Sequence, residues 1–438
     1  MRFGTSGART SLATPSNIDD SSSRQALPPI PGSRREGLSS PTEPDRVLSG
    51  SVVVRETVAA LEGELITFRR DLHEHPELAH QETRTTTRVA ARLRASGARV
   101  RLLTGTGLLA DIGPVDPAYR VALRADLDAL PVAERTGLPF ASRSEGVCHA
   151  CGHDLHVAAV LGAGLALQEH ADLLVARGTG VRLIFQPAEE ITPGGALAVI
   201  DQGGLAGVDS IHTIHCDPTL DVGQVGLREG AITAAVDTVT ITLSGRGGHT
   251  SRPHLTQDLV YALGKVITDV PAVLTRRVDP RAGVVLVWGA VHSGSTENVI
   301  PATGVVTGTL RMLDVQLWEG VAPLIEELVQ AAVSPFGVAA TVDHARGAPP
   351  VVNDPRSVAR LRTSAGLMLG AQAAVPTSQS LGGEDFAWYV QAVPGALARL
   401  GTRTPGGTTY DLHQGDLVVD ERAVGMGARL LAGVVLAS

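Results

Sequence analysis

Helical spacing of apolar residues marks several stretches of this chain. Val58, Leu61, Leu65 and Phe68 recur at that spacing, and the pattern ends before Pro76, because the residue before a proline is disfavoured in a helix. The same reading predicts further helices over residues 82–96, 155–170, 195–202 and 357–369, and a last helix that opens at Asp420-Glu421.

Short apolar runs between these helices predict buried strands. Several of the runs are followed at once by acidic or imidazole side chains. Helices that alternate with buried strands are typical of an α/β fold. The predicted strands cover residues 98–103, 108–112, 119–125, 181–185, 210–214 and 396–400.

A different order of elements begins near Ala231. It reads strand, helix, strand, strand, helix, strand, which is the ferredoxin-like split βαβ pattern. We therefore interpret residues 231–348 as an inserted domain, so that the first domain comprises residues 51–230 and resumes over residues 349–438. The inserted elements cover residues 237–243, 258–270, 284–291, 303–311, 316–333 and 339–343.

Residues 1–50 differ from the rest of the chain in composition. They are rich in Ser, Pro, Arg and Asp and show little apolar periodicity, which predicts a disordered extension. A transit peptide and a misplaced start codon are the alternatives. Acidic residues such as Asp19 and Glu36 are unusual in a transit peptide.

Charge and cysteine content narrow the function classes. The formal net charge is −8 and there is no long basic run, which argues against nucleic acid as a partner. No apolar stretch is long enough for a membrane span, and Met1 does not open a secretory signal. The chain has 3 cysteines, too few for a disulfide framework, so we expect a reducing cytoplasm and metal or catalytic use.

The segment Cys148–His156 concentrates metal-ligating side chains. It reads Cys148-His-Ala-Cys-Gly-His-Asp-Leu-His156, and an apolar helical pattern follows it. Thiolate and imidazole are the ligands that Zn²⁺-like ions prefer. The segment is therefore a candidate part of a metal site.

Carboxylates follow two of the predicted strands. Asp126 and Asp128 come at the end of one, and Asp128 is an even choice between a turn cap and a site residue. Glu189 and Glu190 follow another. Ligand sites of α/β folds lie at the carboxyl ends of strands, and adjacent side chains of extended chain point opposite ways. One glutamate is thus expected to bind metal while the other faces the substrate.

Five ligand-type residues lie at strand ends or helix starts of the first domain. They are too many for one tetrahedral zinc and suit a pair of ions with one bridging group, for which a thiolate is well suited. Glu189, next to one of them, is the natural general base. The five are Cys151, His153, Glu190, His215 and His413.

The ordered set of motifs resembles a known family. Arg124-Ala-Asp-Leu-Asp-Ala-Leu-Pro131, His149-Ala-Cys-Gly-His-Asp154, Pro187-Ala-Glu-Glu190 and Gly247-Gly-His249 are similar to those of the bacterial and plant N-acyl-amino-acid amidohydrolases. That family includes hippurate hydrolases and belongs to the wider di-metal aminoacylase and carboxypeptidase superfamily. The resemblance implies an α/β catalytic domain with a mixed, mostly parallel sheet flanked by helices, and an inserted ferredoxin-like lid that forms dimers.

The resemblance also implies roles at matching positions. It assigns the five ligands to two divalent ions (Zn, Mn, Co or Ni), Glu189 to the general base and Asp128 to orienting the metal site. His249 would hold the substrate carbonyl, often from the partner subunit. Asn298 and Arg311 would lie near the substrate carboxylate, for which Arg is suited. The implied substrate is a small N-acyl amino acid and the implied assembly a homodimer or tetramer.

Some positions depart from the family pattern. Cys148 stands where an apolar residue is usual, and a disulfide to Cys151 would remove the bridging thiolate. Gly383 replaces a common Ser, and His413-Gln-Gly-Asp lacks the usual proline.

Dipeptidase or carboxypeptidase action is the alternative function. A non-catalytic binding protein and a nucleophilic hydrolase are disfavoured, because the ligands are present and no Gly-x-Ser-x-Gly elbow occurs.

Overall fold

The structure of the protein is a computed structural model that describes residues 43–438. Its first helix, α1 (Glu43–Glu74), begins before the predicted start of the folded chain at residue 51. Gly50 and Ser51 are buried, and a Cβ at Gly50 would lie 3.6 Å from a side-chain carbon of Leu173. Packing therefore reaches back to Gly50, and the helix itself begins at Glu43, within the stretch that the composition assigned to a disordered extension. The remainder of that extension lies outside the described residues.

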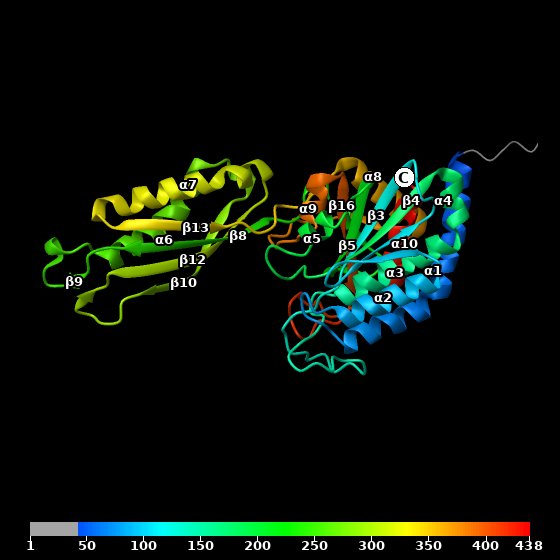
Figure 1. Ribbon diagram of the computed structural model, residues 1–438, viewed down its shortest axis with the longest axis horizontal. Helices are drawn as coiled ribbons and strands as arrows, with labels where there is room; N and C mark the ends of the chain where they lie inside the picture. Colours follow the sequence, from blue (N-terminus) through cyan, green and yellow to red (C-terminus); the bar gives the residue numbers. More distant parts are fainter. Residues whose placement is uncertain (1–42) are drawn as a thin grey trace, which may run out of the picture. The chain divides into compact units, whose positions relative to one another are not determined.

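Eight strands form one mixed sheet (Figure 1). Its four central strands are parallel, and the strand that adjoins them on each side runs antiparallel to them. The carboxyl ends of the central strands therefore meet at one edge of the sheet. The spatial order is β1 (Arg99–Leu102), β2 (Leu108–Ile112), β4 (Thr179–Gln186), β3 (Tyr119–Asp126), β5 (Ser210–Asp221), β16 (Gly395–Arg403), β6 (Val225–Leu227) and β15 (Ala374–Pro376).

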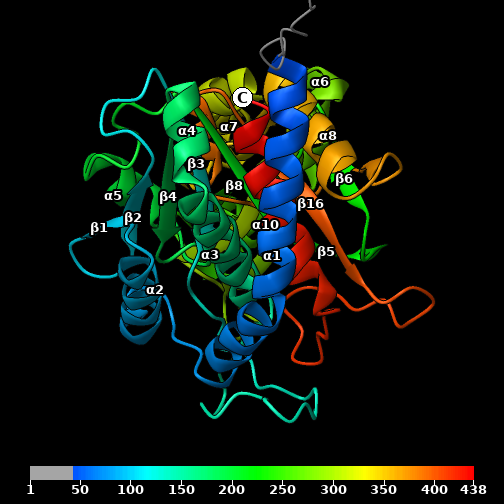
Figure 2. The same ribbon diagram turned by 90° about the vertical axis from the view of Figure 1, so that its right-hand side faces the viewer.

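Helices cover both faces of this sheet. Alternate residues of its central strands point to opposite faces and therefore belong to different hydrophobic clusters. Leu123 and Leu183 pack with one set of helices, whereas Ala122 and Ile184 pack with the other. Figure 2 shows α1, α3 and α10 side by side. The first set comprises α1, α2 (Thr83–Ala95), α3 (His153–Glu169), α4 (Ala171–Arg177), α8 (Pro355–Met368) and α10 (Arg422–Leu436), and the second comprises α5 (Ala196–Asp201) and α9 (Ala387–Ala392).

The chain segment between β7 (Gly230–Ala231) and β14 (Val352–Asn353) forms a second, antiparallel sheet. The strands β7 and β14 pair with each other. We call it, with its helices, the four-stranded unit. Its observed order of long elements is the one predicted from the sequence. Apolar residues on one face of β8 pack against the two helices. The unit comprises, in spatial order, strands β10 (Val285–Ser293), β12 (Thr303–Met312), β8 (Ala235–Ser244) and β13 (Ala339–Ala345), with helices α6 (Leu259–Arg277) and α7 (Val315–Val333).

Short elements complete the described chain. The two-residue strands β9 (Gly248–His249) and β11 (Val299–Ile300) pair with each other in the loops that adjoin the four-stranded unit. Single 3₁₀ turns occur at Pro253–Leu255, Pro280–Ala282 and Ser334–Phe336.

Strand β5 corrects one predicted boundary. The sequence placed its end at Ile214, with His215 just beyond, but the strand continues to Asp221. It does so because β16 runs beside it and pairs along almost its whole length. His215 is therefore an inward-facing strand residue rather than a loop residue.

Among residues 43–438, no single helix has the length and apolar composition of a membrane span, although the bent pair α3 and α4 passes that test together.

Candidate metal centre

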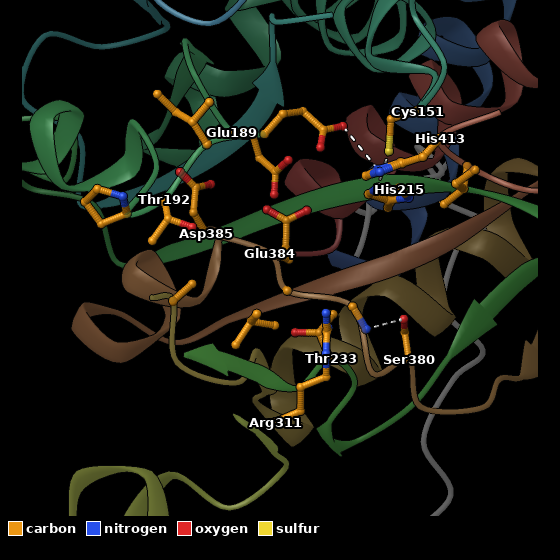
Figure 3. A pocket seen from close by; sticks show the side chains of 18 of the residues that line it. Cys151, Glu189, Thr192, His215, Thr233, Arg311, Ser380, Glu384, Asp385 and His413 are labelled. Atoms are coloured by element: carbon orange, nitrogen blue, oxygen red, sulfur yellow. Dashed lines mark hydrogen bonds and ion pairs between the residues drawn. The ribbon is translucent and has the colours of Figure 1, made fainter. Parts of the chain in front are cut away.

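A cavity of about 500 Å³ opens at the carboxyl edge of the eight-stranded sheet. Residues from the sheet side and from the four-stranded unit both line it. Figure 3 shows Cys151, His215 and His413 together on one side and Arg311 on another. The cavity therefore brings together side chains that are more than 250 positions apart in the sequence.

The start of helix α3 positions the first two predicted ligands. Gly152 precedes the helix in a left-handed conformation, with φ 83°. A Cβ at Gly152 would also lie 2.6 Å from Sγ of Cys216, so glycine is required on both counts. This tight turn places Cys151 just before the helix and His153 at its first position.

Backbone carbonyls set the orientation of both imidazoles that face the thiol. Nδ1 of His153 donates to the carbonyl of Asp128 at 2.9 Å, and Nδ1 of His215 donates to the carbonyl of Cys216 at 2.8 Å. Each ring is thereby left with Nε2 as its free ligand atom. Nε2 of His215 lies 3.5 Å from Sγ of Cys151.

Glu190 and His413 approach Cys151 from other elements. Oε1 of Glu190 lies 3.4 Å from Nε2 of His413 and 3.7 Å from Nε2 of His153. His413 is exposed and has a positive φ of 62°. Its backbone N–H donates to the carbonyl of Ala150 at 2.8 Å, which holds this loop residue beside the start of α3.

Asp128 holds the loop that carries the glutamate pair. Its two carboxylate oxygens accept the backbone N–H groups of Glu189 and Glu190, each at 2.9 Å. Burial acts in the opposite direction, but the hydrogen bonds, led by that of His153, hold the pKa of Asp128 below its usual range. The carboxylate of Asp128 thus stays ionised at neutral pH. It caps this turn and also faces the ring of His153.

The donor atoms fit a pair of metal ions. Two sets of potential ligands, Cys151 with His153 and His215, and Cys151 with Glu190 and His413, each lie within 4.8 Å and share the thiol. Nε2 of His153 and Oε1 of Glu190 are buried without a hydrogen-bond partner, an arrangement that a bound cation would explain. Sulfur, nitrogen and carboxylate oxygen together suit a borderline divalent ion.

The electrostatics of the thiol agree with a cation at this position. Burial, followed by the charges of Glu190 and Glu189, raises the pKa of Cys151 well above its usual range. A thiolate here therefore requires a compensating positive charge, which a metal ion supplies. All 3 cysteines are free and buried, and burial, followed by the charge of Glu134, raises the pKa of Cys148 to about 11.

Glu189 lies in a second group of acidic side chains. Its carboxylate oxygen comes within 4.8 Å of those of Glu384 and Asp385 (Figure 3). Burial, followed by the charge of Glu384, raises the pKa of Glu189 well above its usual range. Glu189 therefore sits where a carboxylate can hold a proton.

A buried cation pairs with two members of this acidic group, and the sequence reasoning missed it. Arg124 is completely buried, and its guanidinium donates to Asp126 at 2.6 Å and Asp385 at 2.8 Å, with Glu384 at 3.2 Å. Asp126 also pairs with Nδ1 of His156 at 2.7 Å. Arg124 follows the buried apolar run of its strand and stands two residues before an aspartate, and this was the signal that could have found the network.

Two predicted substrate residues do not reach the cavity. Val236, near the start of β8, lines the cavity, and Ser244 ends that strand roughly 25 Å further along, at about 3.3 Å per residue. His249 and Asn298 lie beyond that end and are exposed. Arg311, at the other end of the unit, does line the cavity and donates to the backbone carbonyl of Leu381.

Comparison with known proteins identifies related chains. The model of peptidase family M20/M25/M40 matches residues 122–437. The N-acetyl-L-cysteine deacetylase of Bacillus subtilis (strain 168) is 37% identical over 84% of this chain and 86% of its own length. Thermostable carboxypeptidase 1 of Saccharolobus solfataricus is 35% identical over 88% of this chain and 97% of its own.

Two further matches qualify and extend this result. A Rhodococcus jostii protein that bears the name of a glutamate–cysteine ligase is 45% identical over 89% of this chain, but the chain spans only 48% of that protein. The solved structure of a Bacillus subtilis dinuclear metal binding peptidase has a TM-score of 0.75 at 32% identity, covering 86% of this chain and 98% of its own. These matches confirm the predicted family resemblance and the α/β fold class.

Proposed function

This chain belongs to peptidase family M20/M25/M40, and we propose that it is a metal-dependent amidohydrolase that cleaves N-acyl amino acids to a carboxylic acid and an amino acid. The observation that carries the proposal is the pair of ligand sets that share Cys151, with Glu189 beside them. Relatives named deacetylases of N-acetylated amino acids support the substrate class.

The site residues divide the chemistry among themselves. Cys151, His153, Glu190, His215 and His413 would hold two divalent ions, and Cys151 belongs to both sets of potential ligands. Such a pair supplies an acidified water and polarises the scissile carbonyl. Glu189 takes the proton from the attacking water and passes it to the leaving nitrogen. Asp128 keeps Glu189 and Glu190 in place through their backbone N–H groups.

The substrate-facing residues come from the four-stranded unit. We assign residues 231–348 to an inserted lid and dimerisation domain between the catalytic segments 51–230 and 349–438. Arg311 reaches the cavity within one chain and can grip a carboxylate in a bidentate way. Because His249 and Asn298 lie far from the cavity of their own chain, we assign them to the site of a partner subunit.

A substrate panel under a metal titration tests the proposal. The purified protein, loaded in turn with Zn²⁺, Mn²⁺, Co²⁺ and Ni²⁺, should hydrolyse hippurate, N-acetyl or indole-acetyl amino acids in a metal-dependent manner. Chelation should abolish the activity and re-addition should restore it. If two bound ions per chain gave no turnover of any acyl amino acid, the proposed function would be wrong.

Carboxypeptidase or dipeptidase action is the second candidate. The Saccharolobus solfataricus relatives named carboxypeptidases cover this chain as fully as the deacetylases do. The same metal site can cleave a peptide bond, so only the acyl pocket separates the two reactions. Each N-acyl amino acid should therefore be assayed beside the dipeptide with the same carboxyl-terminal residue.

A further inference from the structure

A second buried arginine lies on the cavity wall. Arg399 is only 9% exposed, on strand β16, and its chain neighbours Ala398 and Leu400 are completely buried. It lines the same cavity as Cys151 and His215. No motif in the sequence had drawn attention to it.

The strand register explains why this side chain faces the cavity. Arg399 is the parallel register partner of His215 on β5, and directly paired residues project from the same face of a sheet. Its other neighbour is Gly226 on β6. A Cβ at Gly226 would lie 3.1 Å from Cβ of Arg399, so the glycine leaves room on the flank of the arginine.

The guanidinium of Arg399 has no partner within the part of the chain that the structure describes. It makes no hydrogen bond and no ion pair there, and Asp217 and Glu384 act on it only at longer range. Arg124, buried to a similar degree, contacts three carboxylates. Burying an unpaired charge opposes folding, so fold stability alone does not account for Arg399.

We propose that Arg399 binds a carboxylate of the substrate on the sheet side of the cavity. This rests on the proposed amidohydrolase function. An arginine fork matches a carboxylate in a bidentate way and stays charged at any physiological pH. Arg399 and Arg311 would then present two cations to one ligand, from the sheet and from the four-stranded unit. The α-carboxylate and a second carboxylate, such as that of an N-acyl glutamate, are the two sources of this chemistry.

Carboxamide analogues identify the bound group. The substrates are N-acetylglutamate, its α-amide and its side-chain amide (N-acetylglutamine), assayed with the metal-loaded wild type, Arg399→Met and Arg399→Lys. In the wild type, replacing the carboxylate that Arg399 binds should lower kcat/KM by about 10- to 100-fold, mainly through KM. In Arg399→Met that penalty should disappear, and Arg399→Lys should restore part of it.

Matched measurements separate this role from structural ones. Arg403→Met removes another arginine of β16, which pairs with Asp221 at 2.7 Å, and should leave both amide penalties unchanged. Arg399→Met should keep its metal content and its Tm. Equal amide penalties in Arg399→Met and the wild type, a loss of bound metal, or a lowered Tm would each overturn the proposal.

Binding without turnover keeps the two proposals distinguishable. If the wild type hydrolysed no acyl amino acid, the proposed function would fail, but glutamate binding to the metal-loaded protein could still be measured by calorimetry. Arg399→Met should weaken that binding by about 10-fold or more. Equal affinities would refute the assignment of Arg399.

Discussion

The carboxyl edge of the eight-stranded sheet and the far end of the four-stranded unit both carry predicted site residues, but they hold them differently. At the sheet edge, Asp128, His153 and His215 are buried and fixed by backbone hydrogen bonds. At the end of the unit, His249 and Asn298 are exposed. The difference teaches that one chain preorganises its metal side, whereas the residues that we propose to bind the substrate carbonyl lie exposed and away from the cavity of their own chain.

The largest expected effect is on kcat, from a substitution on the sheet side of the cavity. Glu189→Gln should lower kcat by about 10²- to 10⁴-fold, because the amide cannot take a proton from water. The variant should retain its metal, since Glu189 lies outside the two ligand sets that share Cys151.

Cys151→Ala provides the contrast to this variant. It removes the sulfur common to both ligand sets, so bound metal should fall along with activity. Metal analysis beside steady-state kinetics checks both variants. A near-wild-type kcat for Glu189→Gln would remove Glu189 from the role of base.

The next largest effect is expected on kcat/KM, from a substitution at the far end of the four-stranded unit. His249→Ala should lower kcat/KM by about 10²- to 10³-fold if the imidazole stabilises the carbonyl oxygen. Mixing the His249→Ala protein with the Glu189→Gln protein should then restore about a quarter of the wild-type activity. Half of the randomly formed dimers contain one subunit of each variant, and each such dimer has one intact site out of two. Failure of the mixture to regain activity would show that His249 does not act across a dimer.

A third prediction concerns the buried network behind the sheet-edge site. Nδ1 of His73 lies 2.9 Å from Asp154, and its Nε2 lies 3.2 Å from Glu134, while Arg69 and His149 lie nearby. Burial acts against the charge, but Asp154 first and then Glu134 raise the pKa of His73 from 6.5 to about 9. The resulting stabilisation is complete below pH 6.5 and is lost as the pH rises through 9.

Denaturation across this pH range measures the effect. The wild type should lose about 3 kcal/mol of unfolding free energy between pH 6 and pH 10 through His73. His73→Gln should flatten that part of the profile. Identical pH profiles for the two proteins would refute the raised pKa.

That the predicted ligands lie close together could be anticipated from the sequence, because the signal is local. Polar residues that directly follow buried strands, such as Glu189 and Glu190, must meet at one edge once parallel pairing is assumed. The Cys-Gly-His turn before α3 is likewise a local feature, since the left-handed conformation that the turn requires falls on Gly152.

The site features that could not be predicted depend on contacts between strands that are far apart in the sequence. His215 lies inside β5 because β16, nearly 200 residues later, pairs beside it. Arg399 lies within an apolar run, and only the register with His215 aims it into the cavity. The partners of Arg124 come from residues 126, 384 and 385, which no spacing rule brings together.

The smallest predicted effect lies at the base of the four-stranded unit. Asp237 is completely buried and accepts hydrogen bonds from Trp318 at 2.9 Å, His344 at 2.7 Å and the backbone N–H of Gly347 at 3.0 Å. Asp237→Asn presents an amide NH₂ to these donors, so one is left unsatisfied at a cost of about 1–3 kcal/mol. The exposed Arg277→Met, which breaks a surface pair with Glu327, is the control and should leave Tm within about 1 °C. Equal Tm values for both variants would mean that the buried hydrogen bonds of Asp237 stabilise the unit no more than a surface ion pair does.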